Sequence, residues 1–126
     1  MKQSQRDPQN FLPLTPADFN ILLALADGEK HGYSIMKEIA TQTSGRLHLG
    51  PGTLYGAIKR LLEGDLIEES AERPDPAHDD ERRRYYRLTD FGQQVAAAEA
   101  SRLEELVRLA RDRRLLPDKF PVGGIK

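Results

Sequence analysis

The chain has 126 residues and a formal net charge of −1, with 38% hydrophobic and 31% charged residues. These values predict one compact domain with a modest core and no strong overall charge. The chain has no cysteine, which excludes disulfides, thiol nucleophiles and thiolate metal ligands. No apolar run reaches the roughly 18 residues of a transmembrane helix, and residues 1–14 lack the apolar core of a signal peptide. We therefore expect a cytoplasmic protein with no membrane partner.

The first expected helix follows a polar segment. Residues 1–14 carry two prolines and predict a flexible N-terminal arm. Thr15 is suited to cap a helix that begins with Pro16 and ends at Asp27-Gly28. The spacing of the apolar side chains within it indicates one buried face. The residues of that face are Phe19, Leu22, Leu23 and Ala26.

Two more helices are expected before residue 65. The second begins at His31-Gly32-Tyr33-Ser34, buries Ile35 and Ile39, and runs to about Thr43. The third follows Gly50-Pro51-Gly52 and runs through Glu63. Its predicted core stripe consists of Leu54, Ala57, Ile58 and Leu61.

A β-hairpin is expected next. Leu66–Ser70 and Arg83–Leu88 have the composition of strands, and the loop Arg73–Asp80 between them contains two prolines. Two strands are not stable alone, so we expect them to pack beside the three helices as a wing.

A fourth helix, capped by Thr89, is expected to extend to about Leu116 and to be followed by a flexible tail at residues 117–126. Apolar residues spaced alternately by four and three predict a coiled-coil seam. The seam consists of Ala96, Ala100, Leu103, Val107 and Ala110, with Leu106 and Leu109 widening it. The alternative is a helix that folds back on its own domain. About 27 residues would span roughly 40 Å, more than a domain of this size covers, which favours a dimer.

The predicted fold is therefore mainly α with a small β-hairpin. Residues 15–88 form a winged helix-turn-helix domain of the kind that binds DNA, and residues 89–116 form a dimerisation helix.

Four motifs in this order resemble the PadR family of bacterial regulators, in particular its short branch with a single C-terminal helix. They are His31-Gly32-Tyr33-Ser34-Ile35, Pro51-Gly52-Thr53-Leu54-Tyr55, Arg84-Tyr85-Tyr86-Arg87-Leu88-Thr89 and Gly92, within residues 15–92. The chain departs from the family in having Asp65 where glycine is usual, an acidic wing loop and no tryptophan. Aspartate can also adopt the left-handed conformation that this turn requires. Some members stack aromatic ligands on an interface tryptophan, and that mode cannot apply here.

The outward side of the third helix is the first candidate contact surface. Helical geometry places Gly52, Gly56 and Lys59 there, beside Thr53 and Tyr55. Glycines allow close approach to a groove wall, and hydroxyls and a cation suit phosphate contacts. The alternative is an ordinary turn followed by a solvated lysine, but the surrounding order of elements favours DNA. Tyr33 is a further phosphate contact, or a tyrosine that packs its ring on the domain.

The wing arginines are the second candidate surface. Arg82, Arg83, Arg84 and Arg87 make the basic charge local, and alternation puts Arg83 and Arg84 on opposite faces of the strand. The resemblance favours Arg84, with Arg83 as a helper. The alternative is that the arginines pair with acidic residues such as Glu68 and Glu69 across the hairpin, and we expect some of them to do so.

The resemblance implies a homodimer on a pseudo-palindromic operator in double-stranded DNA. It further implies a repressor that is released by a small effector, and a gap between the alanine-rich seams is a candidate site for a flat aromatic one. The predicted DNA contacts are Tyr33, Gly52, Thr53, Tyr55, Gly56, Lys59, Arg83 and Arg84. The predicted dimer contacts are Ala96, Ala100, Leu103, Leu106, Val107 and Ala110.

Catalytic and metal-binding functions receive little support. The three histidines lack metal-ligand spacing, and the chain contains no nucleotide-binding or hydrolase motif. We expect no enzyme, cofactor or metal, although the acidic loop Asp75–Asp80 leaves a metal-dependent enzyme as a remote alternative. A closer competitor is a winged helix that binds a protein partner without specific DNA binding. The acidic wing loop and the pI near 6.3 favour that competitor.

Overall fold

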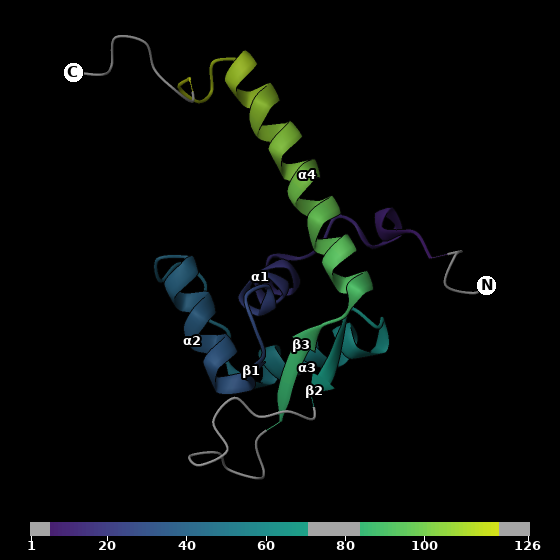
Figure 1. Ribbon diagram of the computed structural model, residues 1–126. Helices are drawn as coiled ribbons and strands as arrows, with labels where there is room; N and C mark the ends of the chain where they lie inside the picture. Colours follow the sequence, from purple (N-terminus) through teal and green to yellow (C-terminus); the bar gives the residue numbers. More distant parts are fainter. Residues whose placement is uncertain (1–5, 71–83, 119–126) are drawn as a thin grey trace.

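A computed structural model describes residues 6–70 and 84–118 as a mainly helical winged helix-turn-helix fold with a small antiparallel sheet (Figure 1). A long terminal helix projects from this domain. In chain order the elements are the 3-10 helix η2 (Pro8–Phe11), α1 (Pro16–Leu25), β1 (Lys30–His31), α2 (Gly32–Gln42), α3 (Pro51–Glu63), β2 (Ile67–Ser70), β3 (Tyr85–Leu88) and α4 (Asp90–Asp112). The loop Arg73–Asp80, Arg82, Arg83 and most of the expected tail lie outside the described residues.

Local capping explains where the helices begin. Thr15 accepts a hydrogen bond from the backbone N–H of Asp18, and Thr89 accepts one from the N–H of Gly92. His31 Nδ1 accepts the N–H of Ser34 at the start of α2. Each side chain satisfies an amide that has no partner within its own helix. These starts, and the core stripe of α3, are confirmed as the sequence predicted.

The predicted buried face of α1 is wrong in three of its four residues. Leu22 is buried as expected, but Leu23 and Ala26 are exposed and Phe19 is only half-buried. The other buried residues are Ile21, Ala24 and Leu25. The cause is that α1 lies at the centre of the fold and contacts α2, α3 and α4, so more than one of its sides is covered. A pattern search for one apolar stripe assumes that only one side is covered.

The sheet has three strands in the order β1-β3-β2, instead of the two expected. The additional strand, β1, is only two residues long and pairs Lys30 with Tyr86 and His31 with Tyr85. It makes β3 the central strand, and the His31 ring meets the Tyr85 ring edge-on at 5.3 Å between centroids. This explains why Tyr85 is buried although it lies on the face of β3 opposite the core residue Tyr86.

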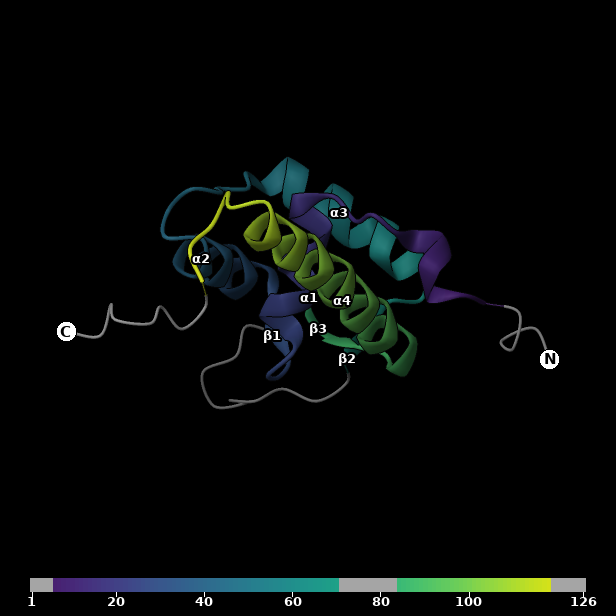
Figure 2. The ribbon, with the colours of Figure 1, turned by 90° about the horizontal axis from the view of Figure 1, so that it is seen from above.

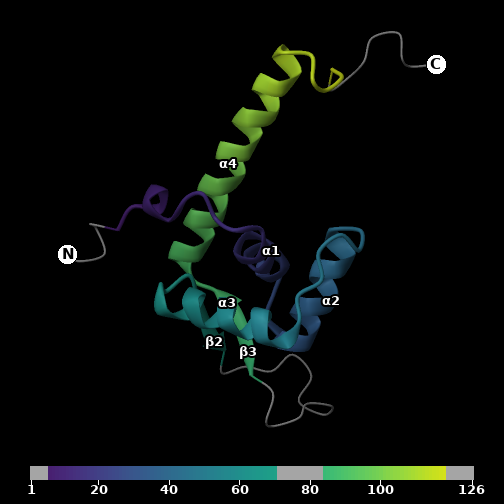
Figure 3. The same cartoon turned by 180° about the vertical axis from the view of Figure 1, so that it is seen from behind.

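The expectation of a flexible arm at residues 1–14 is wrong for residues 6–14. This segment contacts α4, and the rings of Phe11 and Phe91 meet edge-on at 5.4 Å. Figures 1 and 3 show the segment crossing beside α4 before the chain enters α1. Phe11, Leu12 and Leu14 also pack against the core. These apolar contacts order a segment that its prolines and polar residues had suggested was loose.

The projecting helix α4 has two distinct halves. Its first half is buried through Gly92, Val95 and Glu99, whereas Leu106 and Val107 in the second half are exposed. Seen from above in Figure 2, α4 lies across the winged domain, and Figure 1 shows its far end extending well beyond it. The helix ends at Asp112, earlier than the predicted Leu116, because Arg114 takes a left-handed conformation with φ of 64°.

Candidate nucleic-acid interface

The outer face of α3 presents every residue that the sequence predicted for it. Leu54, Ala57, Ile58 and Leu61 are buried. Gly52, Thr53, Tyr55, Gly56 and Lys59 are all exposed on the remaining circumference. The helix therefore uses one side for the fold and leaves the other open along its length. We call Gly52, Thr53, Gly56 and Lys59 the outer face of α3.

The two glycines of this face are not required by the fold. A Cβ atom built at Gly52 or Gly56 would meet nothing within 4 Å, and neither residue has a positive φ. Glycine within a helix costs about 0.5–1 kcal/mol relative to alanine. The folded chain therefore carries a cost here that brings it no packing benefit of its own. Close approach by another molecule is a physical reason for keeping this surface flat.

The amino end of α3 has no side-chain cap. Gly50 occupies the N-cap position and forms no side-chain hydrogen bond, and Pro51 follows it. Free amide groups at a helix start, together with the positive end of the helix dipole, favour an anion such as phosphate. Of the exposed cations on α3, Arg60 forms an ion pair with Asp18 at 2.8 Å. Lys59 has no ion pair with the residues that the structure describes.

The two tyrosines near the start of α2 have different environments. Tyr33 is 58% exposed, and the Nζ of Lys37 lies 5.4 Å from its ring centroid. Tyr55 is 48% exposed, but its hydroxyl lies so close to Gly32 that a Cβ atom there would collide with it. Tyr33 is thus an exposed tyrosine with a cation over its ring, whereas Tyr55 joins α3 to the start of α2. Sequence reasoning missed Lys37, whose exposed position four residues after Tyr33 was the available signal.

The described wing arginines are paired with glutamates of the same chain. Arg84 Nη1 lies 3.2 Å from both carboxylate oxygens of Glu69. Arg87 Nε donates to Glu68 at 2.8 Å, and Nη1 forms a second ion pair with Glu29 at 3.5 Å. The hydrogen bond and charge of Glu68 raise the pKa of Arg87. The predicted pairing across the hairpin is therefore confirmed for these two arginines. Arg83, the other predicted contact on the wing, lies outside the described residues.

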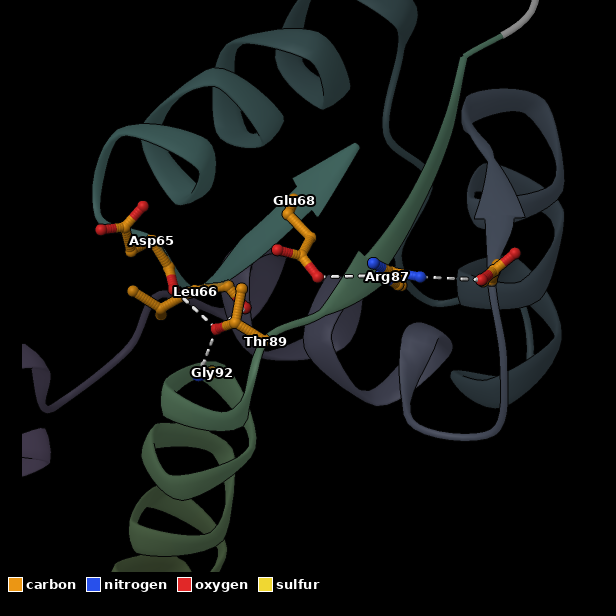
Figure 4. A network of polar contacts seen from close by, with 7 residues as sticks. Asp65, Leu66, Glu68, Arg87, Thr89 and Gly92 are labelled. Atoms are coloured by element: carbon orange, nitrogen blue, oxygen red, sulfur yellow. Dashed lines mark hydrogen bonds and ion pairs between the residues drawn. The ribbon is translucent and has the colours of Figure 1, made fainter. Parts of the chain in front are cut away.

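A polar junction connects the wing to the first turn of α4 (Figure 4). Thr89 Oγ1 donates to the carbonyl oxygen of Asp65 at 2.6 Å and accepts the N–H of Gly92. Gly92 packs so closely on the carbonyl of Leu66 that a Cβ atom would collide with it. Asp65 has φ of 63°, so the turn after α3 keeps its left-handed residue without glycine, as the sequence predicted. The junction thus ties α4 to the turn after α3.

The predicted dimer residues fall on both halves of α4. Ala96 packs against the chain's own core, and Leu103 and Ala110 are half-buried. Ala100, Leu106 and Val107 are exposed. Glu99 lies on the side of α4 that meets the domain and is 2% exposed, a buried carboxylate that the sequence analysis did not predict. One of its partners, Arg102, is three residues further along α4, but the other, the backbone N–H of Leu14, is 85 residues away, and no local pattern could have revealed it.

Residues 6–70 and 84–118 contain no group of three acidic or histidine side chains able to hold a metal ion. The acidic loop Asp75–Asp80 lies outside these residues. No helix among them is both long and apolar enough to cross a membrane.

Comparison with protein families identifies the chain. The profile of the transcriptional regulator PadR-like family matches residues 21–98, more than half of the sequence. The chain belongs to the PadR-like family. The matched region runs from α1 into the first half of α4 and includes the whole outer face of α3. An uncharacterized 37.1 kDa protein in transposon TN4556 of Streptomyces fradiae is 39% identical over 90 residues. That match covers 71% of this chain, which spans only 24% of the length of the relative.

Solved structures of transcriptional regulators share the fold. A transcriptional regulator from Clostridium thermocellum superposes with a TM-score of 0.62 at 27% identity, covering 76% of this chain and 87% of the other. Bacillus subtilis PadR in complex with operator DNA superposes with a TM-score of 0.57 at 22% identity. That alignment covers 68% of this chain and 47% of the Bacillus protein. These likenesses agree with the winged helix-turn-helix architecture described above.

Proposed function

We propose that this PadR-like protein is a transcription regulator that binds double-stranded DNA through the outer face of α3. The observation that carries the proposal is the contrast between the two sides of that helix. One side is packed in the core, and the other is exposed, uncapped at its start and flattened by two glycines that the fold does not need. An exposed helix of this kind fits the major groove, which is wide enough to admit an α-helix. The operator complex of Bacillus subtilis PadR supports the same use of the fold.

Each predicted contact has a distinct role in this proposal. Gly52, Thr53 and Gly56 approach the base edges, with Tyr55 at the side next to α2. Lys59 and Tyr33 contact phosphates, which fix the register of a protein on DNA without reading its sequence. Arg84, and Arg83 near the tip, reach the backbone from the wing once Arg84 exchanges Glu69 for a phosphate.

We further propose a homodimer formed through the second half of α4. Leu106 and Val107 are exposed there, and Leu109 is exposed beside them. Apolar side chains spaced by three and four residues on a projecting helix match the seam of a coiled coil. A twofold dimer presents two α3 helices to a pseudo-palindromic operator, with half-sites about 10 bp apart or a multiple of that.

The dimer is tested by replacing Leu106, which is 49% exposed and distant from the domain core. In sedimentation experiments, Leu106→Glu should convert a dimer into a folded monomer, because two buried carboxylates would face each other across the seam. Glu104→Leu on the same helix is the matched control and should leave the dimer intact. A wild-type monomer at micromolar concentration would contradict the proposal.

We also propose that the regulator represses its promoter and releases it when a small effector binds between the two α4 helices. The family resemblance supports this step, and the small side chains Ala100 and Ala110 on the seam provide room for a flat ligand. Since the chain has no tryptophan, such a ligand would be held by aliphatic side chains. A reporter gene under the native promoter tests the sign of regulation, because deletion of the regulator should raise expression.

The decisive experiment for DNA binding is a fluorescence-anisotropy titration. The probe is the duplex upstream of the protein's own gene, compared with a scrambled duplex of equal length at 50 and 200 mM salt. We expect the natural duplex to bind at least about a thousandfold more tightly than the scrambled duplex, with an affinity that falls steeply as the salt concentration rises. Equal and weak binding of both duplexes would favour the competing function, a winged helix that binds a protein partner. The ion pairs that Arg84 and Arg87 form with glutamates of the same chain are the observation that favours this competing function.

A further inference from the structure

The segment Arg6–Leu14 contacts α4 at three separate places, and at two of them it also contacts the end of α3. At its start, the Arg6 guanidinium lies 4.0 Å from the ring centroid of Phe91 in the first turn of α4. The same guanidinium donates to the carbonyl oxygen of Gly64 at 2.7 Å and forms an ion pair with Asp65 at 3.5 Å. Arg6 therefore touches α4 and the end of α3 simultaneously.

The middle contact is aromatic. Phe11 meets Phe91 edge-on, an arrangement that stabilises an aromatic pair beyond the area it buries. A Cβ atom added to Gly64 would come within 3.3 Å of the Phe11 ring. Phe11 thus fills the space between the first turn of α4 and the last turn of α3.

The last contact is a buried charged hydrogen bond. The backbone N–H of Leu14 donates to Glu99 Oε2 at 3.1 Å, and Arg102 donates to both oxygens of the same carboxylate at 2.6 and 3.0 Å. Arg102 and the Leu14 amide hold the pKa of Glu99 below its usual value, in spite of its burial. Removal of such an acceptor would leave a buried N–H without a partner, which is costly. The end of the segment is therefore firmly attached to α4.

These contacts bear on the direction of α4. The junction at Thr89 and Gly92 attaches α4 to the domain at its first turn. One point of attachment alone would not determine the angle between α4 and the domain. The contact at Glu99 lies seven residues further on, which is about 10 Å along the axis. α1 supports α4 as well. The segment adds a second brace, and Figure 3 shows it crossing in front of the body of α4 on its way to α1.

We propose that Arg6–Leu14 is a positioning strap that sets the angle between α4 and the DNA-reading helix α3. The inference rests on the proposed function, since a dimer formed through α4 converts that angle into the separation of its two α3 helices. The 23 residues of α4 span about 34 Å, so a rotation of about 10° moves the far end by roughly 6 Å. Successive nucleotides of a DNA strand are about 3.4 Å apart along the axis. The strap thus determines which spacing of half-sites the dimer accepts.

The first test measures the angle itself, without DNA. Because the chain has no cysteine, nitroxide labels can be attached at Lys59→Cys on α3 and Glu105→Cys on the exposed side of α4. Double electron–electron resonance is recorded on doubly labelled chains diluted in excess unlabelled protein, so that the distance within one chain dominates. Arg6→Ala/Phe11→Ala should broaden or shift that distance by about 4 Å for every 10° of rotation. Asn10→Ala, on the exposed side of η2, is the matched control and should reproduce the wild-type distribution.

The outcomes separate a positioning role from a merely structural one. A folded double variant with the wild-type distance distribution would overturn the strap, even if its melting temperature has fallen. If circular dichroism shows the double variant unfolded, Arg6→Ala alone decides, since the Arg6 side chain is partly exposed. In a second arm, duplexes with one base pair added or removed between the half-sites are titrated. The strap variant should discriminate among them less than wild type does. Failure of all DNA binding would contradict the proposed function while leaving the distance result to judge the strap.

Discussion

The outer face of α3 and the wing carry two sets of predicted DNA contacts, yet the two surfaces differ in how many of their side chains are already paired within the chain. Lys59 has no ion pair within the described residues, and Gly52 and Gly56 face open space. On the wing, Arg84 and Arg87 already have carboxylate partners. DNA would meet the first surface directly, whereas on the second it must displace an internal partner. We therefore expect α3 to provide most of the affinity, and the wing to adjust it.

The largest effect is expected at Gly56. Gly56→Leu places a bulky side chain on the outer face, where nothing within 4 Å of the Cβ position obstructs folding. The free energy of unfolding should rise by about 0.5–1 kcal/mol, since leucine favours the helix more than glycine does. Specific DNA binding should weaken by at least about tenfold, because the backbone can no longer approach the groove wall. Thermal denaturation and anisotropy titration measure the two opposite changes.

The control for this variant is Gln93→Leu, on an exposed position of α4. It adds the same side chain to a helix surface without touching α3, and DNA affinity should stay at the wild-type value. Unchanged affinity in Gly56→Leu would mean that α3 does not enter a groove, and the proposed roles of the two surfaces would then have to be exchanged.

A smaller loss is expected at Lys59. Lys59→Ala removes one phosphate contact, so the plot of log K against log salt concentration should become less steep by about one unit. Affinity should fall roughly fivefold, equally for natural and scrambled duplexes, because phosphates carry no sequence information. Arg113→Ala, which removes an exposed cation at the end of α4, controls for the change of net charge. If both variants shift the slope alike, Lys59 acts only through the overall field.

The two surfaces also differ in how far the sequence revealed them. The outer face of α3 follows from helical periodicity, because only one side of that helix is packed and its stripe is unambiguous. The same method failed for α1, which is covered on several sides. Strand alternation put Arg84 and Tyr86 on one face, but it did not reveal β1, whose two residues are too few to form a pattern.

Contacts between distant parts of the chain were the least predictable. Leu14 and Glu99 are 85 residues apart, and Arg6 and Gly64 are separated by 58. Neither pair lies within one element, so no repeat in the sequence relates them. The early end of α4 was missed for a different reason. It depends on a left-handed arginine, and residue preferences would assign that position to glycine or asparagine.

The smallest expected effect concerns the pairing of Arg84 with Glu69. Glu69→Gln keeps the size of the side chain and removes the charge that holds Arg84, which is exposed enough to reach a phosphate. We expect DNA affinity to rise about two- to fivefold, the range set by an exposed ion pair. The salt dependence should steepen, because a free arginine releases one more counterion on binding. Glu68→Gln is the matched control. It adds the same unit of charge, but Arg87 keeps its second partner Glu29, so the gain should be smaller. An equal gain in both variants would show that DNA affinity depends on the net charge of the wing. It would contradict the view that Glu69 specifically keeps Arg84 from a phosphate of the DNA.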